Sequence, residues 1–277
     1  MLSTATGRVF ELVGRLAGGE TGAHELHGPE DERLILKWEL DRSSQASRRV
    51  AVGLTDRLRT AARWPVPRQQ LVDVGDWLLI TQELLPGTPV ETLTHDLLDQ
   101  LLGLHDARLG LARPEDDSTW PHRLVETLAV GGVGYCLHEP LRSHDHRTAD
   151  VIDRIERLAA ALDPNTFSGD DVVHWDWHPG NLLQVDGQLS AVVDNDFATI
   201  GDAAFDLVTL AIASLDVACE DGVRDRMEAG ALNELSEQKR QAYEAHLLLR
   251  LIDWAIRAQR ADDLEFWVHE AQQRLPT

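Results

Sequence analysis

One short segment constrains the fold of this chain more than any other. Residues 172–194 have the pattern of a β-hairpin, within a part of the chain that is otherwise typical of helix. Asp186-Gly187 is a strong two-residue turn signal, and the residues on both sides are rich in apolar and β-branched types. We therefore expect residues 182–185 to pair antiparallel with residues 188–191.

The open end of this hairpin gathers oxygen atoms. Counting back from the turn places Asn181 opposite Val192, which brings Asn181 close to Asp194. An amide oxygen and a carboxylate suit Mg²⁺, which takes few protein ligands and keeps water and phosphate oxygens. Asp176 lies in the turn that leads into the same end, where a third acid can orient or deprotonate a hydroxyl group. Acids in turns often belong only to a solvated loop, but His174, Asp176 and Asn181 have the spacing of a kinase catalytic loop.

The chain changes its periodicity after its first third. Residues 1–83 have the pattern of short strands around one helix, which Pro65 ends. The remainder has mostly helical apolar spacing, apart from the hairpin. We expect a first lobe over residues 1–83, a hinge over residues 84–89, and a second, larger lobe over residues 90–277.

Composition limits the partners and the location. The chain has 26 Lys and Arg against 47 Asp and Glu, a formal net charge of −21, which argues against nucleic acid or an anionic membrane as a partner. It has no apolar stretch of membrane-spanning length and no signal-peptide pattern. Its two cysteines, Cys136 and Cys219, are far apart. These features predict a cytoplasmic protein without disulfides, whereas the sequence does not indicate an oligomeric state.

Two motifs resemble the signature of the aminoglycoside phosphotransferase-like small-molecule kinases. They are His174-x-Asp176-x-His178-Pro179-Gly180-Asn181-Leu182-Leu183 with Val192-Val193-Asp194, and Gly201-Asp202-Ala203-Ala204-Phe205-Asp206-Leu207. The resemblance implies an α+β, bilobal protein-kinase-like fold, with a small antiparallel-sheet N-lobe carrying one helix and a larger helical C-lobe containing the catalytic hairpin. It also implies transfer of the γ-phosphate of ATP to a hydroxyl group. By this resemblance, residues 1–83 are the N-terminal nucleotide-binding lobe and residues 90–277 are the C-terminal catalytic and acceptor-binding lobe.

The resemblance assigns roles to five of these residues. It implies that Asp176 is the catalytic base and that Asn181 and Asp194 hold Mg²⁺. It further implies that His174 and Asp206 brace the catalytic loop.

Lys37 is the candidate cation for the ATP phosphates. It is one of only two lysines and lies in an apolar strand after a glycine-bearing hairpin, where a kinase needs a cation for the α- and β-phosphates. Protein-kinase-like enzymes pair this lysine with a glutamate on the following helix, but residues 44–64 contain no glutamate. Asp56 is the only acid there. Because aspartate is shorter, we expect it to pair with Lys37 less closely than a glutamate would, or not at all.

Glycines and the hinge complete the expected nucleotide site. Gly18, Gly19 and Gly22 would let the backbone approach the phosphates, although glycine-rich turns are common. Adenine would lie against the linker and use backbone N–H and C=O groups, so we expect contacts at Glu83 and Leu85.

The strongly negative charge suits a polycationic acceptor, because an acidic cleft concentrates cationic ligands. Side chains that could meet the acceptor are Asp196, Asp216, Asp253, Trp254 and Trp267. For each of them alone, a solvated face or a core position is the simpler interpretation. The best-known acceptors of the resembled family are aminoglycosides, and relatives phosphorylate basic cyclic peptides of the capreomycin and viomycin kind. We therefore expect an antibiotic-inactivating kinase that uses ATP and Mg²⁺ and confers resistance.

Other interpretations stay open. A metabolite kinase acting on choline, homoserine or a sugar would share every catalytic residue and differ only in its acceptor pocket. A nucleotide-binding pseudokinase or a purely interacting protein remains an alternative because the helix glutamate is missing. A protein kinase fits less well, since Asn195-Asp196-Phe197 follows Asp194 where a protein kinase has Phe-Gly. A structural zinc site lacks the usual ligand spacing among Cys136, His138, His144 and His146.

Overall fold

The computed structural model describes residues 2–16, 22–116 and 118–276 of the 277-residue chain. Internal contacts group the residues into two units. The first contains Met1–Arg108 and His174–Thr199, and the second contains Leu109–Val173 and Ile200–Thr277. The hairpin therefore belongs to the same unit as the N-terminal sheet. The lobe boundaries expected on either side of residues 84–89 stay a prediction.

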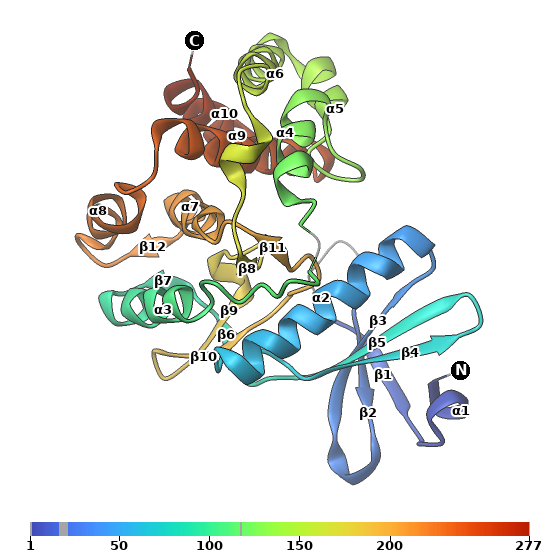
Figure 1. Ribbon diagram of the computed structural model, residues 1–277. Coiled ribbons are helices and arrows are strands. Elements are labelled where there is room, and N and C mark those ends of the chain that lie inside the picture. The colour runs from blue at the N-terminus through green and yellow to red at the C-terminus, as the bar shows by residue number, and fades with distance from the viewer. Residues whose placement is uncertain (1, 17–21, 117, 277) are drawn as a thin grey trace. The chain divides into compact units, whose positions relative to one another are not determined.

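A five-stranded antiparallel sheet forms the N-terminal part of the first unit (Figure 1). Its order is β1-β2-β3-β5-β4, and its strands are β1 (Glu11–Arg15), β2 (His24–His27), β3 (Arg33–Glu39), β4 (Gln69–Val74) and β5 (Trp77–Glu83). The single-turn helix η1 (Pro29–Asp31) joins β2 to β3. Lys37 lies on β3, opposite Ile80 of β5. Because side chains alternate along a strand, Lys37 points to the face opposite that of Leu34 and Leu36, which pack in a cluster with Leu2 of the short helix α1 (Leu2–Thr6).

The predicted helix of the N-terminal part is α2 (Arg42–Ala61), which lies along β3 and β4 (Figure 1). Asp41 is its N-cap and accepts a hydrogen bond from the backbone of Ser44. A buried stripe of Ala51, Leu54, Thr55 and Leu58 faces the protein interior. The helix ends before Pro65, as the sequence predicts.

The hairpin also forms where the sequence predicts it, with one shift in register. β9 (Leu182–Val185) pairs antiparallel with β10 (Gln188–Val192), and β6 (Thr88–Pro89) adds to β9. A bulge around Ser190 moves Val192 opposite Leu182, so the expected pairing of Asn181 with Val192 is wrong. The N–H of Val193 donates to the C=O of Asn181 at 2.9 Å instead.

The rest of the first unit connects these parts. It contains β7 (Thr92–Leu93), α3 (His95–Ala107) and the single-turn helix η3 (Pro179–Asn181). Gln100 of α3 accepts a hydrogen bond from the N–H of Leu189, and Trp64 donates to the C=O of Leu104. The hairpin and the residues that follow α2 are thus both attached to α3.

The second unit is mainly helical (Figure 1). Its α-helices are α4 (Trp120–Val130), α5 (His138–His144), α6 (His146–Ala159), α7 (Ala204–Ala213), α8 (Val223–Met227), α9 (Glu237–Arg257) and α10 (Ala261–Arg274). Shorter elements join them, namely η2 (Pro164–Phe167), η4 (Ser214–Asp216), η5 (Glu228–Leu232), β8 (Asp171–Val173) and β12 (Ala218–Cys219). The strand β11 (Thr199–Gly201) begins at the last residue of the first unit and continues into the second. Trp120, Phe205 and Tyr243 pack their rings together in its core. The expected α+β class is confirmed.

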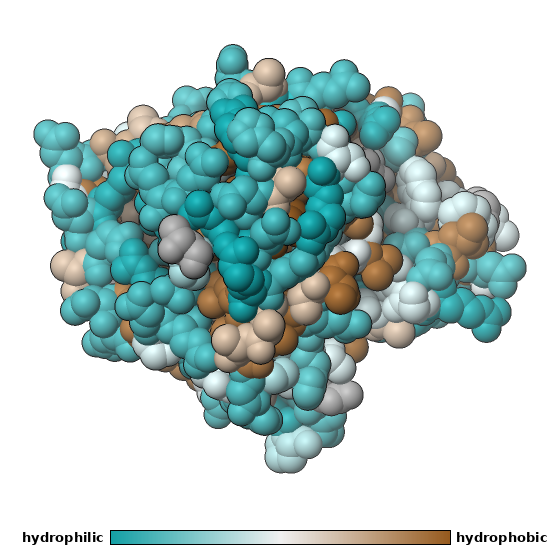
Figure 2. All heavy atoms as spheres, turned by 90° about the horizontal axis from the view of Figure 1, so that it is seen from above, coloured by the Kyte–Doolittle hydropathy of each residue, from teal (hydrophilic) through white to brown (hydrophobic). Residues whose placement is uncertain are grey.

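The surface is mostly hydrophilic on the face that Figure 2 shows, with apolar residues visible in smaller areas between the polar ones. In the part of the chain that the structure describes, no helix is both long and apolar enough to cross a membrane.

Candidate active site

The turn before the hairpin has an unusual backbone. Trp175 has a φ of +78° and Asp194 has a φ of +60°, so both adopt the left-handed conformation. For residues other than glycine this conformation costs about 1–2 kcal/mol and persists only where the surrounding structure enforces it. Such positions concentrate at functional sites. These two lie on either side of Asp176 and the hairpin, in the motif that the sequence singles out.

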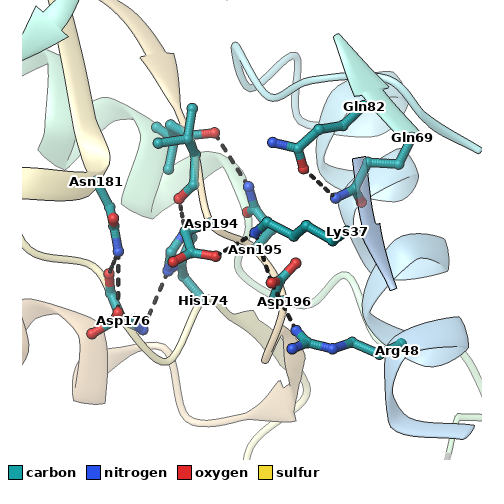
Figure 3. A network of polar contacts seen from close by, with 12 residues as sticks. Lys37, Arg48, Gln69, Gln82, His174, Asp176, Asn181, Asp194, Asn195 and Asp196 are labelled. Carbon is teal, nitrogen blue, oxygen red and sulfur yellow. Dashed lines mark hydrogen bonds and ion pairs between the residues drawn. The ribbon is translucent and has the colours of Figure 1, made fainter. Parts of the chain in front are cut away.

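His174 connects the turn to the end of the hairpin. It is fully buried, and its Nδ1 accepts a hydrogen bond of 3.2 Å from the N–H of Asp176. In the neutral ring the other nitrogen therefore carries the hydrogen, and Nε2 donates to the C=O of Val193 at 3.0 Å. His174 thereby fixes Asp176 relative to the residue that precedes Asp194 (Figure 3).

Asn181 is oriented by the same turn. Its Nδ2 donates to the C=O of Asp176 at 2.9 Å and to the Oδ2 of Asp176 at 3.1 Å. Because the amide nitrogen makes these two bonds, the amide oxygen remains the group that can accept a ligand. The side chain of Asp194 lies at the same end of the hairpin (Figure 3) and is 43% exposed.

The donor set of Asn181 and Asp194 fits Mg²⁺. Both supply hard oxygen atoms, and Mg²⁺ typically takes one or two protein carboxylates together with water and phosphate oxygens. Among the described residues, no group of three or more His, Cys, Asp and Glu side chains could hold a metal ion. A protein-only metal cage, including the zinc site weighed above, therefore has no support in this part of the chain.

Lys37 reaches this end of the hairpin from β3. Its Nζ lies 2.8 Å from Asp194 Oδ1 and 2.7 Å from Asp196 Oδ2. Burial disfavours the ammonium form, but the charges of Asp196 and Asp194 outweigh this effect and raise the pKa of Lys37. Burial likewise opposes ionisation of Asp196, yet Lys37 and Arg48 lower its pKa. Lys37 and Asp196 are therefore both charged near neutral pH.

Arg48 is the functional candidate that the sequence does not reveal. It lies on α2, and its Nη1 forms an ion pair of 2.9 Å with Asp196 Oδ2 (Figure 3). Its guanidinium also stacks over the ring of Phe197, 5.1 Å from the centroid. The only signal in the sequence is indirect, because the helix that should carry a glutamate carries arginines instead.

A buried cation also contacts the loop that contains Asp176. Arg108 is fully buried, and its guanidinium lies 4.8 Å from the ring centroid of Trp177 and 5.2 Å from that of Trp64. Trp177 follows Asp176 directly. The stack therefore fixes the loop beside the candidate base, and no sequence motif indicates it.

Asp56, the other expected member of the lysine clamp, lies elsewhere. It forms an ion pair with Arg59 of the same helix, and its side chain is 62% exposed. Of the expected phosphate-loop glycines, Gly18 and Gly19 lie outside the described residues. Gly22 has a φ of +73°, a conformation that favours glycine.

The two residues expected to contact adenine, Glu83 and Leu85, differ in whether their backbone groups are already hydrogen-bonded. The N–H of Glu83 donates to the C=O of Arg68, and the Glu83 side chain pairs with Arg68 as well. Among the residues that the structure describes, none hydrogen-bonds to the backbone N–H or C=O of Leu85. Leu85 thus keeps both groups open to a ligand, whereas the N–H of Glu83 is occupied.

The candidate acceptor residues divide by burial. Asp253 is fully buried and paired with Arg257, and Trp267 is buried in the core of the second unit. Asp216 is exposed and Trp254 is half-buried, so both are more accessible. Partial burial and the nearby charge of Asp263 raise the pKa of Asp216. Trp254 stacks with the guanidinium of Arg260. Asp196, the remaining acceptor candidate, faces Lys37 and Arg48, as described above. Asp206, which was expected to brace the loop rather than to contact an acceptor, is fully buried in α7. The burial of Asp253 and Trp267 gives no support to a direct contact with an acceptor.

Comparison with known proteins identifies the family. The sequence profile described as the phosphotransferase enzyme family matches residues 13–249. The chain belongs to this family. No curated protein matches the sequence of this phosphotransferase.

Solved structures of small-molecule kinases share its fold. A thermostable mutant of aminoglycoside phosphotransferase APH(4)-Ia matches with a TM-score of 0.70 at 14% identity, covering 98% of this chain and 96% of that one. Amicoumacin kinase hAmiN, in complex with AMP-PNP, Ca²⁺ and Ami, matches with a TM-score of 0.61 at 15% identity, covering 96% and 89%. A proposed fructosamine-3-kinase from Thermobifida fusca matches with a TM-score of 0.56 at 19% identity, covering 98% and 97%. The expected kinase-like fold is confirmed.

Proposed function

We propose that this phosphotransferase transfers the γ-phosphate of ATP, with Mg²⁺, to a hydroxyl group of a cationic small molecule. One observation carries the proposal: the end of the hairpin gathers Asp176, Asn181 and Asp194, and Lys37 pairs with Asp194 there. Enzymes that transfer phosphoryl groups need a residue for the attacking hydroxyl, oxygen ligands for a metal and a cation for the phosphates. The chain has a candidate for each role.

Each candidate has a defined task. Asp176 accepts a hydrogen bond from the acceptor hydroxyl and takes its proton as the new oxygen–phosphorus bond forms. The bond between the γ-phosphorus and the β–γ bridging oxygen breaks in the same step, and ADP leaves with that oxygen. Asn181 and Asp194 would hold Mg²⁺, which supplies positive charge to the phosphate oxygens when bound. Lys37 binds the α- and β-phosphates, and the backbone of Leu85 binds adenine.

Three residues are proposed to keep the base in place. His174 fixes the turn through its bonds to the N–H of Asp176 and the C=O of Val193. Asn181 orients the Asp176 carboxylate through its Nδ2. The buried Asp206 is proposed to brace the same loop, as the family resemblance implies.

For the acceptor, we propose a cationic antibiotic such as an aminoglycoside or a peptide of the capreomycin and viomycin kind. The net charge of −21 supports a cationic ligand. A structure of similar fold also supports such a ligand, since a thermostable mutant of aminoglycoside phosphotransferase APH(4)-Ia was solved in a ternary complex with AMP-PNP and hygromycin B. Of the expected acceptor residues, Asp216 and Trp254 remain accessible for this role. A cytoplasmic location stays a prediction from composition.

A metabolite kinase is the second candidate. The proposed fructosamine-3-kinase, whose name refers to a sugar derivative, has a similar fold. ATP consumption, measured against aminoglycosides, tuberactinomycins, choline, homoserine and sugars, separates the two. Mass spectrometry of the acceptor should show the added phosphate, and the Asp176→Asn variant should add it about 10²- to 10⁴-fold more slowly. Turnover of a metabolite alone would contradict the antibiotic acceptor. Nucleotide binding without any transfer would indicate a pseudokinase.

A further inference from the structure

The acidic partner of Lys37 does not come from α2. The carboxylate of Asp196, two residues after Asp194, fills this place: its Oδ2 lies 2.7 Å from the Nζ of Lys37. The helix α2 contributes a cation instead, Arg48. Arg48 Nη1 lies 2.9 Å from the same oxygen of Asp196, Oδ2. One carboxylate oxygen thus binds two cations that come from β3 and from α2 (Figure 3).

These charges are poorly exposed. The side chains of Asp196, Arg48 and Lys37 are 5%, 13% and 14% exposed. Water can therefore replace a missing partner only in part, so each group depends on the others to remain charged and ordered. The guanidinium of Arg48 also lies over the ring of Phe197, in a cation–π contact. The arrangement is a fixed cluster rather than a surface ion pair.

The two carboxylates that contact Lys37 have different expected uses. In the proposed function, Asp194 is a ligand of Mg²⁺, and a divalent cation there competes with Lys37 for the carboxylate. Asp196 is then the carboxylate that remains for the ammonium group. Arg48 is positively charged, like Lys37, so it cannot form an ion pair with the ammonium group in place of Asp196.

We propose that Asp196 is a positioning residue of the nucleotide site. It holds the Lys37 ammonium group where the α- and β-phosphates bind, the task that a helix glutamate performs in protein-kinase-like enzymes. Arg48 orients Asp196 and thereby links α2 to the hairpin. The inference rests on the proposed function, because it needs a nucleotide at Lys37.

The test measures nucleotide affinity by calorimetry with AMP-PNP and Mg²⁺, without an acceptor. Replacing Asp196 by Asn removes its charge at nearly constant size, and the dissociation constant should rise about tenfold or more, the effect of losing a charged hydrogen bond. Asp196→Glu should restore part of the affinity. Asp186→Asn is the matched control, because it removes one carboxylate from the exposed hairpin turn and should change the dissociation constant less than about twofold.

A double-mutant cycle tests whether Asp196 acts through Lys37. In the Lys37→Met background, Asp196→Asn should change the nucleotide dissociation constant less than about twofold, because the group that it positions is gone. Arg48→Met should weaken binding less than Asp196→Asn does, and this effect should also disappear without Lys37. Circular dichroism and thermal unfolding identify variants that fail to fold, in which case the Arg48→Met pair decides the question.

Each outcome has one meaning. An unchanged dissociation constant in Asp196→Asn overturns the inference, and so does an equal loss of affinity in the presence and absence of Lys37. If that loss is accompanied by a higher Mg²⁺ requirement, Asp196 is a metal ligand instead. A wild-type protein that binds no nucleotide contradicts the proposed function itself, and the inference with it.

Discussion

The amide nitrogen of Asn181 donates to the carboxylate of Asp176 at 3.1 Å. One asparagine thus orients the candidate base while its oxygen stays open to a metal. Asn181→Ala removes both functions, so the Mg²⁺ concentration for half-maximal activity should rise about 10- to 100-fold, the range seen when metal-site partners are removed. Magnesium titration of activity and of AMP-PNP binding measures the effect. A change in turnover at an unchanged Mg²⁺ requirement would show that Asn181 only orients Asp176.

Asp176→Asn tests the base directly. The substitution keeps the size of the side chain and removes its ability to take a proton, so turnover should fall about 10²- to 10⁴-fold. Nucleotide affinity should stay within about twofold, because Asp176 is assigned no contact to ATP. Steady-state kinetics and AMP-PNP calorimetry separate the two quantities. Full turnover in this variant would rule out the assigned role.

Local sequence patterns are sufficient to predict the elements that carry the site. The Asp186-Gly187 turn and the apolar runs beside it predict the hairpin, and the helical spacing after residue 44 predicts α2. The predicted register is wrong by one residue because the strand bulges at Ser190. The Ser190 hydroxyl donates to the C=O of Pro86 at 2.8 Å, a contact with the linker that turn counting does not include.

Contacts between residues far apart in the sequence account for the other features of the site that the sequence does not predict. The sequence places Lys37 correctly on a strand but offers Asp56 as the only acid of the following helix, residues 44–64. Its actual partners, Asp194 and Asp196, are 157 and 159 residues away in the sequence, and no local periodicity predicts such pairs. The stack of Arg108 on Trp64 and Trp177 depends on three separate segments and is not predictable for the same reason.

Arg108 gives a prediction about stability. A guanidinium is flat and stacks on aromatic rings, whereas an ammonium group is compact and does not. Arg108→Lys should therefore lower the free energy of unfolding by about 2 kcal/mol or more, the value of a cation–π interaction in a desolvated site. Chemical denaturation measures it, with Arg63→Lys at an exposed position just after α2 as the control. Equal stabilities of the Arg108→Lys variant and the wild type would contradict a structural role of the stack.

Asp145 predicts how stability depends on pH. It caps α6 by accepting hydrogen bonds from the N–H groups of Thr148 and Arg147, which lower its pKa from 3.8 to about 2 although burial opposes the shift. A pKa that is lower in the folded state stabilises the fold above the unfolded value, and this contribution disappears as the pH falls towards 2. Asp145→Ala should therefore lower the free energy of unfolding by about 1 kcal/mol at pH 7, with a smaller difference below about pH 4. Urea unfolding between pH 7 and pH 3 measures this, and Asp145→Asn, which keeps an acceptor without the charge, should lose less stability at pH 7. A difference between wild type and Asp145→Ala that stays constant down to pH 3 would mean that the cap does not depend on the ionised carboxylate.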